Sequence, residues 1–192
     1  WNQNSYNFNV SHNFDDNGTN LTFDIDYSLY GNGSDNLYTN NYLFTNGNQA
    51  LDQFKLRNDQ STDISIIASQ LDFTKTFANK YSLEAGAKIS MVSTDNNTIF
   101  NALENGEWIN QTNRSNNFEY DENVFALYSN VSKTFGKVNV QAGLRMEHTN
   151  SEGKSVTLDQ SVPLEYTNLF PSLSLSHKIG EKHDLSYSYS KR

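Results

Sequence analysis

Apolar and polar residues alternate along residues 138–150, VNVQAGLRMEHTN. Val138 and Met146 fall on one face of an extended chain, and Arg145 and Glu147 fall on the other. A period of two predicts a β-strand, because successive side chains of a strand point to opposite faces. The alternation lasts about ten residues, which is longer than the usual five or six residues of a strand.

The same alternation recurs along the chain and predicts eight strands in total. They cover residues 6–14, 21–29, 67–77, 81–91, 125–135, 138–150, 169–179 and 185–189.

The connections between these strands alternate in length. Short turns are expected at residues 15–20, 78–80, 136–137 and 180–183, long polar loops at 31–61 and 94–122, and a loop of medium length at 150–166. Within the first loop, QALDQFKLR (49–57) is a candidate for additional strand. In an up-and-down antiparallel sheet, every second connection lies on the same side. All short turns are therefore expected at one end of the sheet and all long loops at the other, as in outer-membrane barrels.

Strand length favours a membrane wall over a soluble β-sandwich, which also alternates apolar and polar residues. About ten residues at roughly 3.3 Å each, tilted by about 40°, rise on the order of 25 Å, the height of the apolar band of a transmembrane barrel.

Aromatic rings and lysines at the strand ends support the same interpretation. Rings flank the short turns, and such rings prefer the boundary between membrane and water. Lys75 and Lys133 lie on the apolar face, two residues before Phe77 and Phe135, where a lysine can extend its charge toward lipid headgroups.

Composition limits the classes of function. The chain has 192 residues, a net charge of −8 and no cysteine, and its mean hydropathy is −0.72 with 13% aromatic residues. The acidic balance gives no support to nucleic-acid binding, which needs a clustered basic surface. No apolar run is long enough for a membrane helix, whereas a transmembrane strand needs only about 9–11 residues.

The C-terminal third carries a family likeness. YSNVSKTFGKVNVQAGLRMEHTNSEG and NLFPSLSLSHKIGEKHDLSYSYSKR contain a tight Phe-Gly-Lys turn, a Gly-Leu-Arg-x-Glu strand and a Phe-Pro-Ser-Leu strand. On these motifs, residues 124–192 resemble the outer membrane protein β-barrel family of Bacteroidetes, which are TonB-dependent-receptor-like proteins. Residues 1–123 match that family only in their long strands and Asn-rich loops.

The resemblance implies a large plugged barrel, of which these strands form about a third. We expect residues 1–192 to be a segment of one all-β, antiparallel up-and-down transmembrane barrel domain in the outer membrane of a Gram-negative cell. Neither a signal peptide nor a plug domain is visible in this sequence. The expected partners are outer-membrane lipid, a plug domain and a periplasmic energy-coupling protein in the full-length protein, and a surface lipoprotein or other envelope subunits.

Ligand recognition is expected in the long loops, which in barrels of this kind face the exterior. The loop at 94–122 contains Trp108, Arg114 and Tyr120 among many amides, a combination suited to glycan or peptide contacts. A loop that only shields the barrel mouth is the alternative.

No residues are expected to support catalysis, a metal or another cofactor. Asp24 and Asp26 lie about 7 Å apart on one strand face, and lumen-lining carboxylates are commoner in such a wall than a catalytic pair. DDNGTN (15–20) resembles the start of a calcium loop but lacks the downstream glutamate, and it has the composition of a tight turn. The four histidines are scattered without metal-ligand spacing.

Three functions are consistent with these observations. The first is the barrel segment of a TonB-dependent-type receptor that takes up a nutrient. The second is a non-transporting barrel that serves as a scaffold in an envelope complex, and the third is a soluble secreted β-sandwich or adhesin.

Overall fold

The computed structural model describes residues 1–77, 81–180 and 182–191, which form nine strands and no helix. The strands are β1 (Asn2–Asn13), β2 (Asn20–Leu43), β3 (Gln49–Phe77), β4 (Tyr81–Glu104), β5 (Glu107–Asn110), β6 (Asn116–Phe135), β7 (Val138–Ser155), β8 (Gln160–Ile179) and β9 (His183–Ser190). Among the described residues, no helix has the length and apolarity needed to cross a bilayer.

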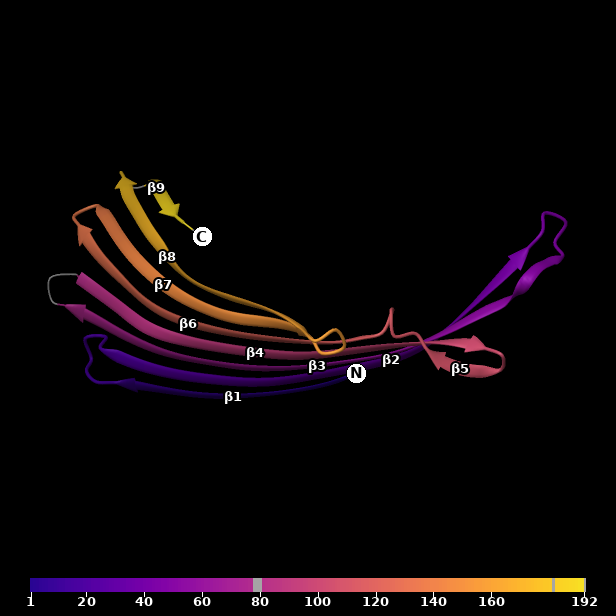
Figure 1. The fold of residues 1–192 in the computed structure, drawn as a ribbon. Coiled ribbons are helices and arrows are strands. Elements are labelled where there is room, and N and C mark those ends of the chain that lie inside the picture. The colour runs from indigo at the N-terminus through magenta and orange to yellow at the C-terminus, as the bar shows by residue number, and fades with distance from the viewer. Residues whose placement is uncertain (78–80, 181, 192) are drawn as a thin grey trace.

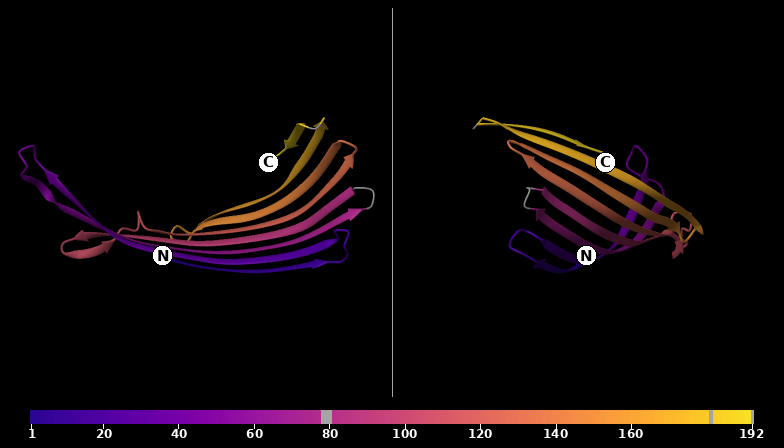
Figure 2. Two further views of the ribbon diagram at one scale, coloured as in Figure 1. Left: turned by 180° about the vertical axis from the view of Figure 1, so that it is seen from behind. Right: turned by 90° about the vertical axis from the view of Figure 1, so that its left-hand side faces the viewer.

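All nine strands belong to one antiparallel sheet in the order β1-β2-β3-β4-β6-β7-β8-β9, and β5 pairs only with the end of β4. Apart from this short hairpin, each strand pairs with its neighbour along the chain, which is the predicted up-and-down topology. The sheet is curved and open, with β1 and β9 at opposite edges (Figures 1 and 2). This is the form expected of a piece of a barrel wall.

The short connections lie at one end of the sheet, here called the turn end, and the long hairpins lie at the other, here called the hairpin end (Figure 1). The predicted turn at 15–20 is present, with Gly18 at a φ of 87°. Gly136 begins the two-residue turn between β6 and β7, at a φ of 59°. The predicted turn at 78–80 lies outside the described residues.

The predicted loops at 31–61, 94–122 and 150–166 are largely strand, so that part of the sequence prediction is wrong, whereas the candidate strand at 49–57 is confirmed within β3. Residues 31–61 continue β2 and β3 without a break in pairing from Gly31 opposite Asp63 to Asn40 opposite Phe54. Residues 94–122 extend β4 and β6 and add β5, and residues 150–166 extend β7 and β8. Backbone pairing continues in these regions although regular alternation of apolar and polar residues is lost along most of their length.

The hairpin formed by residues 31–63 of β2 and β3 is called the arm below. It reaches well beyond the other strands and bends away from the sheet (Figures 1 and 2). A register irregularity lies between Asn40 and Tyr42 near its tip.

Apolar side chains from successive strands meet in rows on one face of the sheet, here called the apolar face. Leu71 lies opposite Phe23 and Ala87, and Leu127 lies opposite Ala87 and Met146. Met146 in turn lies opposite Leu169. Directly opposite residues share a face, so the predicted strand faces coincide across the whole sheet. The apolar runs cover residues 67–77, 81–91, 125–135 and 169–179 and together form a band about ten residues high.

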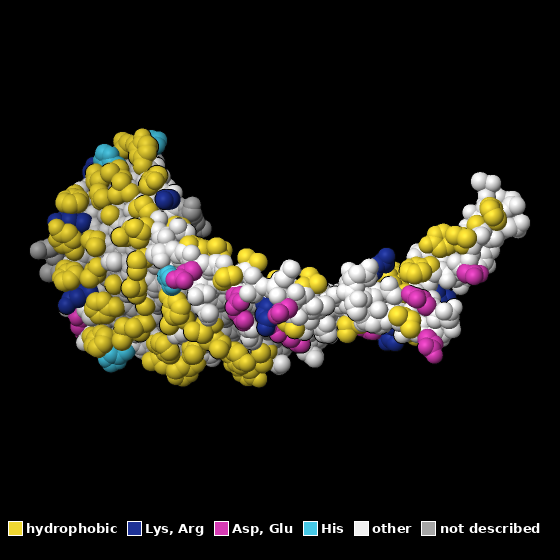
Figure 3. All heavy atoms as spheres, in the orientation of Figure 1, with side chains coloured by type: hydrophobic (Ala, Val, Ile, Leu, Met, Phe, Trp, Pro, Cys, Tyr) yellow, Lys and Arg dark blue, Asp and Glu magenta, His cyan; other side chains and the backbone are white. Residues whose placement is uncertain are grey.

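This band has no protein layer on it within the described residues. Ala102 and Ala126 are the buried hydrophobic residues of the described chain, neither lies on the apolar face of the band, and no large side chain is fully buried. At the middle of the band, Leu127 is 58% exposed and Leu144 is 52% exposed. Figure 3 shows apolar side chains gathered over the turn-end half of the molecule.

Water is a poor solvent for such a face. Leaving half of a leucine-sized side chain in water forfeits about 1 kcal/mol, and roughly ten such residues would forfeit about 10 kcal/mol. That is comparable to the entire stability of a typical domain. Lipid hydrocarbon around the band removes this cost, and the single layer does not support the β-sandwich alternative.

Candidate functional site

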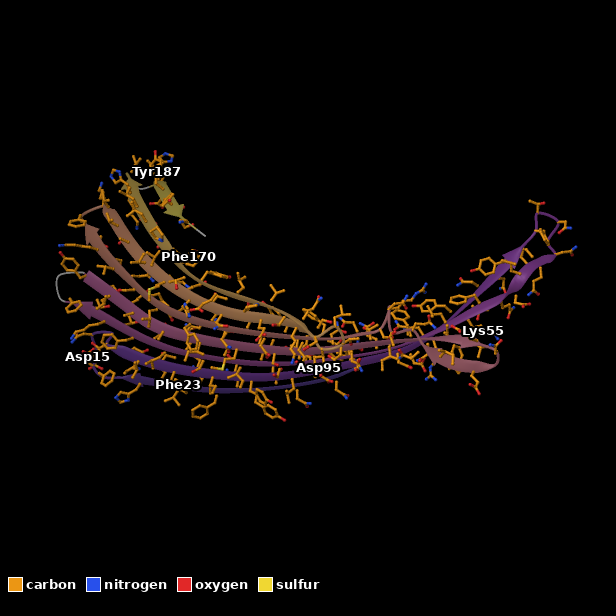
Figure 4. All side chains as sticks on the ribbon, viewed as in Figure 1. Asp15, Phe23, Lys55, Asp95, Phe170 and Tyr187 are labelled. Atoms are coloured by element: carbon orange, nitrogen blue, oxygen red, sulfur yellow. The ribbon has the colours of Figure 1, made fainter. Side chains whose placement is uncertain are left out.

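The opposite, polar face of the band carries charged and amide side chains on the same strands. One row runs across five strands and joins Asp72 on β3, Gly86 on β4, Tyr128 on β6, Arg145 on β7 and Phe170 on β8. In Figure 4, Phe23 marks the apolar face of β2, and Phe170 marks β8, where its side chain belongs to this polar row.

Tyr128 is the centre of a side-chain network in this row. Its hydroxyl donates a hydrogen bond to Asp72 Oδ1, and Gln70 Nε2 donates to Asp72 Oδ2 at 2.6 Å. On the other side, the Arg145 guanidinium lies 5.4 Å from the centre of the Tyr128 ring and pairs with Glu147. The network therefore crosses β3, β6 and β7 and holds both signs of charge on the polar face.

Gly86 makes room for the Tyr128 side chain. A Cβ atom on Gly86 would lie 2.4 Å from Tyr128 Cζ and 2.6 Å from Asp72 Oδ1. Only glycine allows Tyr128 to cross β4 and reach Asp72. Gly143 on β7 has a similar role, because its Cβ would lie 2.1 Å from Asn130 Oδ1 and 2.6 Å from Ser172 Oγ.

A hollow of 780 Å³ lies beside this network, with side chains of β6, β7 and β8 in its lining. The lining includes Tyr128, Arg145, Glu147, Phe170, Ser190 and Lys191. It offers both charges, hydroxyls and an aromatic ring to a polar solute.

The carboxylates of Asp72 and Glu147 are hydrogen-bonded or ion-paired, as expected for side chains that line a hydrated wall. Asp72 accepts hydrogen bonds from Tyr128 and Gln70, and Glu147 is paired with Arg145. Among the described residues, no group of three or more His, Asp or Glu side chains is placed to hold a metal ion.

Asp24 and Asp26 lie on the polar face, where each carboxylate accepts a hydrogen bond from an asparagine of β1. Asn9 donates to Asp24, and Asn7 Nδ2 donates to Asp26 Oδ1 at 2.7 Å. The neighbouring hollow of 160 Å³ also contains Gln70 and Lys88. The pair therefore lines the polar face, as predicted.

Asp15 organises the turn at 15–20. Its Oδ1 accepts hydrogen bonds from the backbone N–H of Asn17 at 2.9 Å and of Thr19 at 3.0 Å, and its Oδ2 accepts one from Thr19 Oγ1 at 2.7 Å. The hydrogen bond from the Thr19 backbone is the main reason that the pKa of Asp15 lies below its usual value. The carboxylate is thus used within the turn, which agrees with the prediction of a turn.

The three loop residues proposed for ligand binding do not form one site. Trp108 lies on β5 opposite Leu103, Tyr120 lies on β6 opposite Thr94, and Arg114 lies in the turn between β5 and β6. Residues 94 and 103 are separated by about 30 Å along β4 at roughly 3.3 Å per residue. An odd separation also puts them on opposite faces of the sheet.

Each of these residues has its own surroundings. Trp108 is 42% exposed, and Arg114 N donates to Gln111 O at 2.9 Å. The Tyr120 hydroxyl donates to Glu122 at 2.8 Å, and this bond to a carboxylate is the main reason that the pKa of Tyr120 is raised.

The sequence prediction overlooked Tyr128 as a functional residue. Its neighbour Arg145 was correctly assigned to the polar face, but Tyr128 and Asp72 are 56 residues apart in the chain. The signal available in the sequence was a glycine on the polar side of a strand, which often marks close approach by another group. That signal does not identify the approaching residue without the strand register.

Comparisons with known proteins agree with this architecture. A family model described as "Outer membrane protein beta-barrel family" matches residues 12–192. No curated protein matches the chain.

Among solved structures, the unliganded ferric citrate transporter FecA superposes with a TM-score of 0.60 at 11% sequence identity. The match covers 96% of this chain and 26% of that chain, so this chain spans about a quarter of the transporter's length. At this identity the likeness concerns the fold alone. The family match over nearly the whole chain, with the lipid-compatible band and the polar opposite face, shows that the chain belongs to the outer membrane protein β-barrel family and lies in the outer membrane.

Proposed function

We propose that this chain is part of the barrel wall of a TonB-dependent-type receptor that takes up a nutrient across the outer membrane. The observation that carries the proposal is the polar face of the band, where the Asp72–Tyr128–Arg145–Glu147 network sits behind a lipid-compatible surface. A wall with one apolar and one hydrated face can enclose a polar lumen.

In this proposal the wall performs no chemistry and needs no cofactor. The hairpin end faces the exterior and supplies the first contacts with cargo. A plug domain elsewhere in the full-length protein then moves under periplasmic energy coupling, and the cargo passes along the polar face. Trp108, Arg114 and Tyr120 act in this scheme as separate contact points on the hairpins.

Two findings support this proposal over a scaffold role. The polar face presents both signs of charge, and the fold is similar to that of a transporter, FecA. A surface lipoprotein or other envelope subunits are further proposed partners at the hairpin end.

The test uses a strain that lacks the full-length gene, complemented by the intact gene or by an Arg145→Glu variant. Uptake of labelled ferric chelates, cobalamin, oligopeptides and oligosaccharides is measured with and without a protonophore. We expect deletion to abolish uptake of one of these classes, the protonophore to do the same in the intact strain, and Arg145→Glu to reduce it at unchanged barrel abundance. Unchanged uptake of every class in the deletion strain would favour the scaffold role.

A further inference from the structure

The apolar face ends at the turn end in a group of rings and two lysines, here called the basic rim. The rim consists of Lys75 and Phe77 on β3, Tyr81 on β4, and Lys133 and Phe135 on β6. Tyr81 lies opposite both Phe77 and Lys133. All five side chains therefore share the lipid-facing surface.

The aromatic rings hold the two ammonium groups in place. Lys133 Nζ lies 3.8 Å from the centre of the Tyr81 ring and 4.8 Å from that of Phe135, and it donates to Tyr81 Oη at 2.6 Å. Lys75 Nζ lies 5.2 Å from the centre of the Phe77 ring. A lysine ordered by aromatic faces keeps its charge available to a further anion.

Neither lysine forms an ion pair with a carboxylate among the described residues. The charge of Lys75 contributes to the lowered pKa of Asp15 in the neighbouring turn. The Asp15 carboxylate, however, already accepts hydrogen bonds within that turn. Lys75 and Lys133 stand on either side of β4, two strand spacings across the sheet and two residues along it, or about 12 Å apart. The rim is thus a pair of ordered positive charges at the edge of the hydrocarbon band.

The other edge of the same face has the opposite charge. Toward the hairpin end, the apolar face continues into an acidic region in which Asp63, Asp95 and Glu119 lie in one row. Asp121 and Glu152 lie opposite each other in the adjacent row. Lys154 is the basic member of the first row, 3.9 Å from Glu119. Figure 3 shows acidic side chains where the apolar area gives way to the arm.

We propose that the basic rim binds the phosphate of an anionic phospholipid in the leaflet at the turn end. The charge of the rim complements an anionic headgroup, and the rim is continuous with the band that contacts acyl chains. The acidic region at the opposite edge repels the same headgroup, so the lipid-facing surface distinguishes its two leaflets. This proposal depends on the position in the outer membrane and is independent of transport.

The test measures lipid binding to the delipidated full-length barrel by native mass spectrometry, with phosphatidylglycerol and phosphatidylcholine of identical acyl chains. A lysine close to an anionic lipid surface contributes about fivefold in affinity. We expect the intact protein to prefer phosphatidylglycerol, and Lys75→Gln/Lys133→Gln to lower its affinity at least tenfold with little change for phosphatidylcholine.

Two matched variants separate headgroup binding from general effects. Lys178→Gln removes a lysine at the same end of the sheet but on the polar face, and it should leave the preference unchanged. Lys75→Arg/Lys133→Arg keeps both charges and should retain the preference, which also controls for folding of the rim. Equal affinity of the intact protein for the two lipids would overturn the proposal, as would an equal loss in Lys178→Gln.

Discussion

The band and the arm are two parts of the same strands, yet their side chains follow different rules. In the band, β2 and β3 place Phe23 opposite Leu71 on one face and Asp24 opposite Gln70 on the other. In the arm the same pairing of β2 with β3 continues. There an ion pair between Asp35 and Arg57 lies on the face that is apolar in the band. Backbone pairing alone is therefore enough to form the strands. Strict alternation of apolar and polar residues indicates, in addition, that lipid lies on one side of the sheet and water on the other.

The largest expected effect comes from a charge placed on the apolar face of the band. Leu127→Arg at its middle should cost about 2–4 kcal/mol of folding free energy in lipid vesicles, because a guanidinium replaces a lipid-facing side chain. The matched change in the arm is Leu51→Arg, where the native side chain is 64% exposed. It should change the folding free energy by less than about 0.5 kcal/mol.

Denaturant titration of both variants in the same vesicles measures this difference. Similar losses at the two positions would mean that the band and the arm share one environment.

A smaller effect is expected when a glycine of each region gains a methyl group. Gly86→Ala in the band should cost about 1–3 kcal/mol, because the new Cβ displaces Tyr128 from Asp72. Gly33→Ala in the arm places its Cβ 3.7 Å from Gln60 O, an ordinary contact. This change should be neutral or stabilise the protein by up to about 1 kcal/mol.

The cause of the Gly86 effect can be tested with a double-mutant cycle. If the loss comes from the Tyr128 side chain, Gly86→Ala and Tyr128→Ala together should cost clearly less than the sum of the two single changes. Simple additivity would point to a backbone effect instead.

The smallest expected effect concerns the ion pair of the arm. The pKa of Asp35 lies below its usual value, chiefly because Arg57 donates hydrogen bonds to its carboxylate. The stabilising contribution of the pair is therefore present above the ordinary pKa of an aspartate and is lost as the pH falls through the lowered value. Arg57→Gln should raise the pKa of Asp35 toward its usual value in a carboxyl NMR titration.

Salt provides a second readout of the same ion pair. Because both side chains are about half exposed, high salt should weaken the pair and reduce the difference between Arg57→Gln and the intact protein. If the pKa of Asp35 changes neither with Arg57→Gln nor with salt, the ion pair does not form in solution.

The fold of the band could be predicted because alternation encodes its two environments. Residues 81–91 and 125–135 each present one apolar and one polar side, and the structure confirms both strands and both faces. The tight Phe-Gly-Lys turn likewise fixed the pairing of β6 with β7, which begins with Phe135 opposite Val138.

Apart from the candidate strand at 49–57, which lies in β3, the extensions could not be predicted because they lack a regular alternation of apolar and polar residues over most of their length. Segments such as Asn96–Thr98 lack any alternation, so the sequence resembles a loop although β3 and β6 flank it on both sides. Strand formation there is imposed by ladders that start in the band.

For the candidate site, the sequence could predict which residues lie on the polar face, but not which side chains touch each other. Alternation placed Arg145 on the polar face, whereas the contacts of Tyr128 with Arg145 and Asp72 depend on a register set by several hairpins. For the same reason, the sequence did not show that Trp108 and Tyr120 lie far apart. The two residues are twelve positions apart in the sequence, but they pair with distant parts of β4. Trp108 pairs near the end of β4 because β5 folds back on it, and Tyr120 pairs with Thr94.

Site-directed spin labelling along residues 138–147 of β7 tests the central claim most directly. The chain has no cysteine, so each introduced label is unique within it. In full-length protein in lipid vesicles, labels at Leu144 and Met146 should collide with oxygen dissolved in the hydrocarbon, and labels at Gln141 and Arg145 with a water-soluble nickel reagent. Loss of this two-residue alternation, or a label at Leu144 that neither reagent reaches, would contradict a wall between lipid and water.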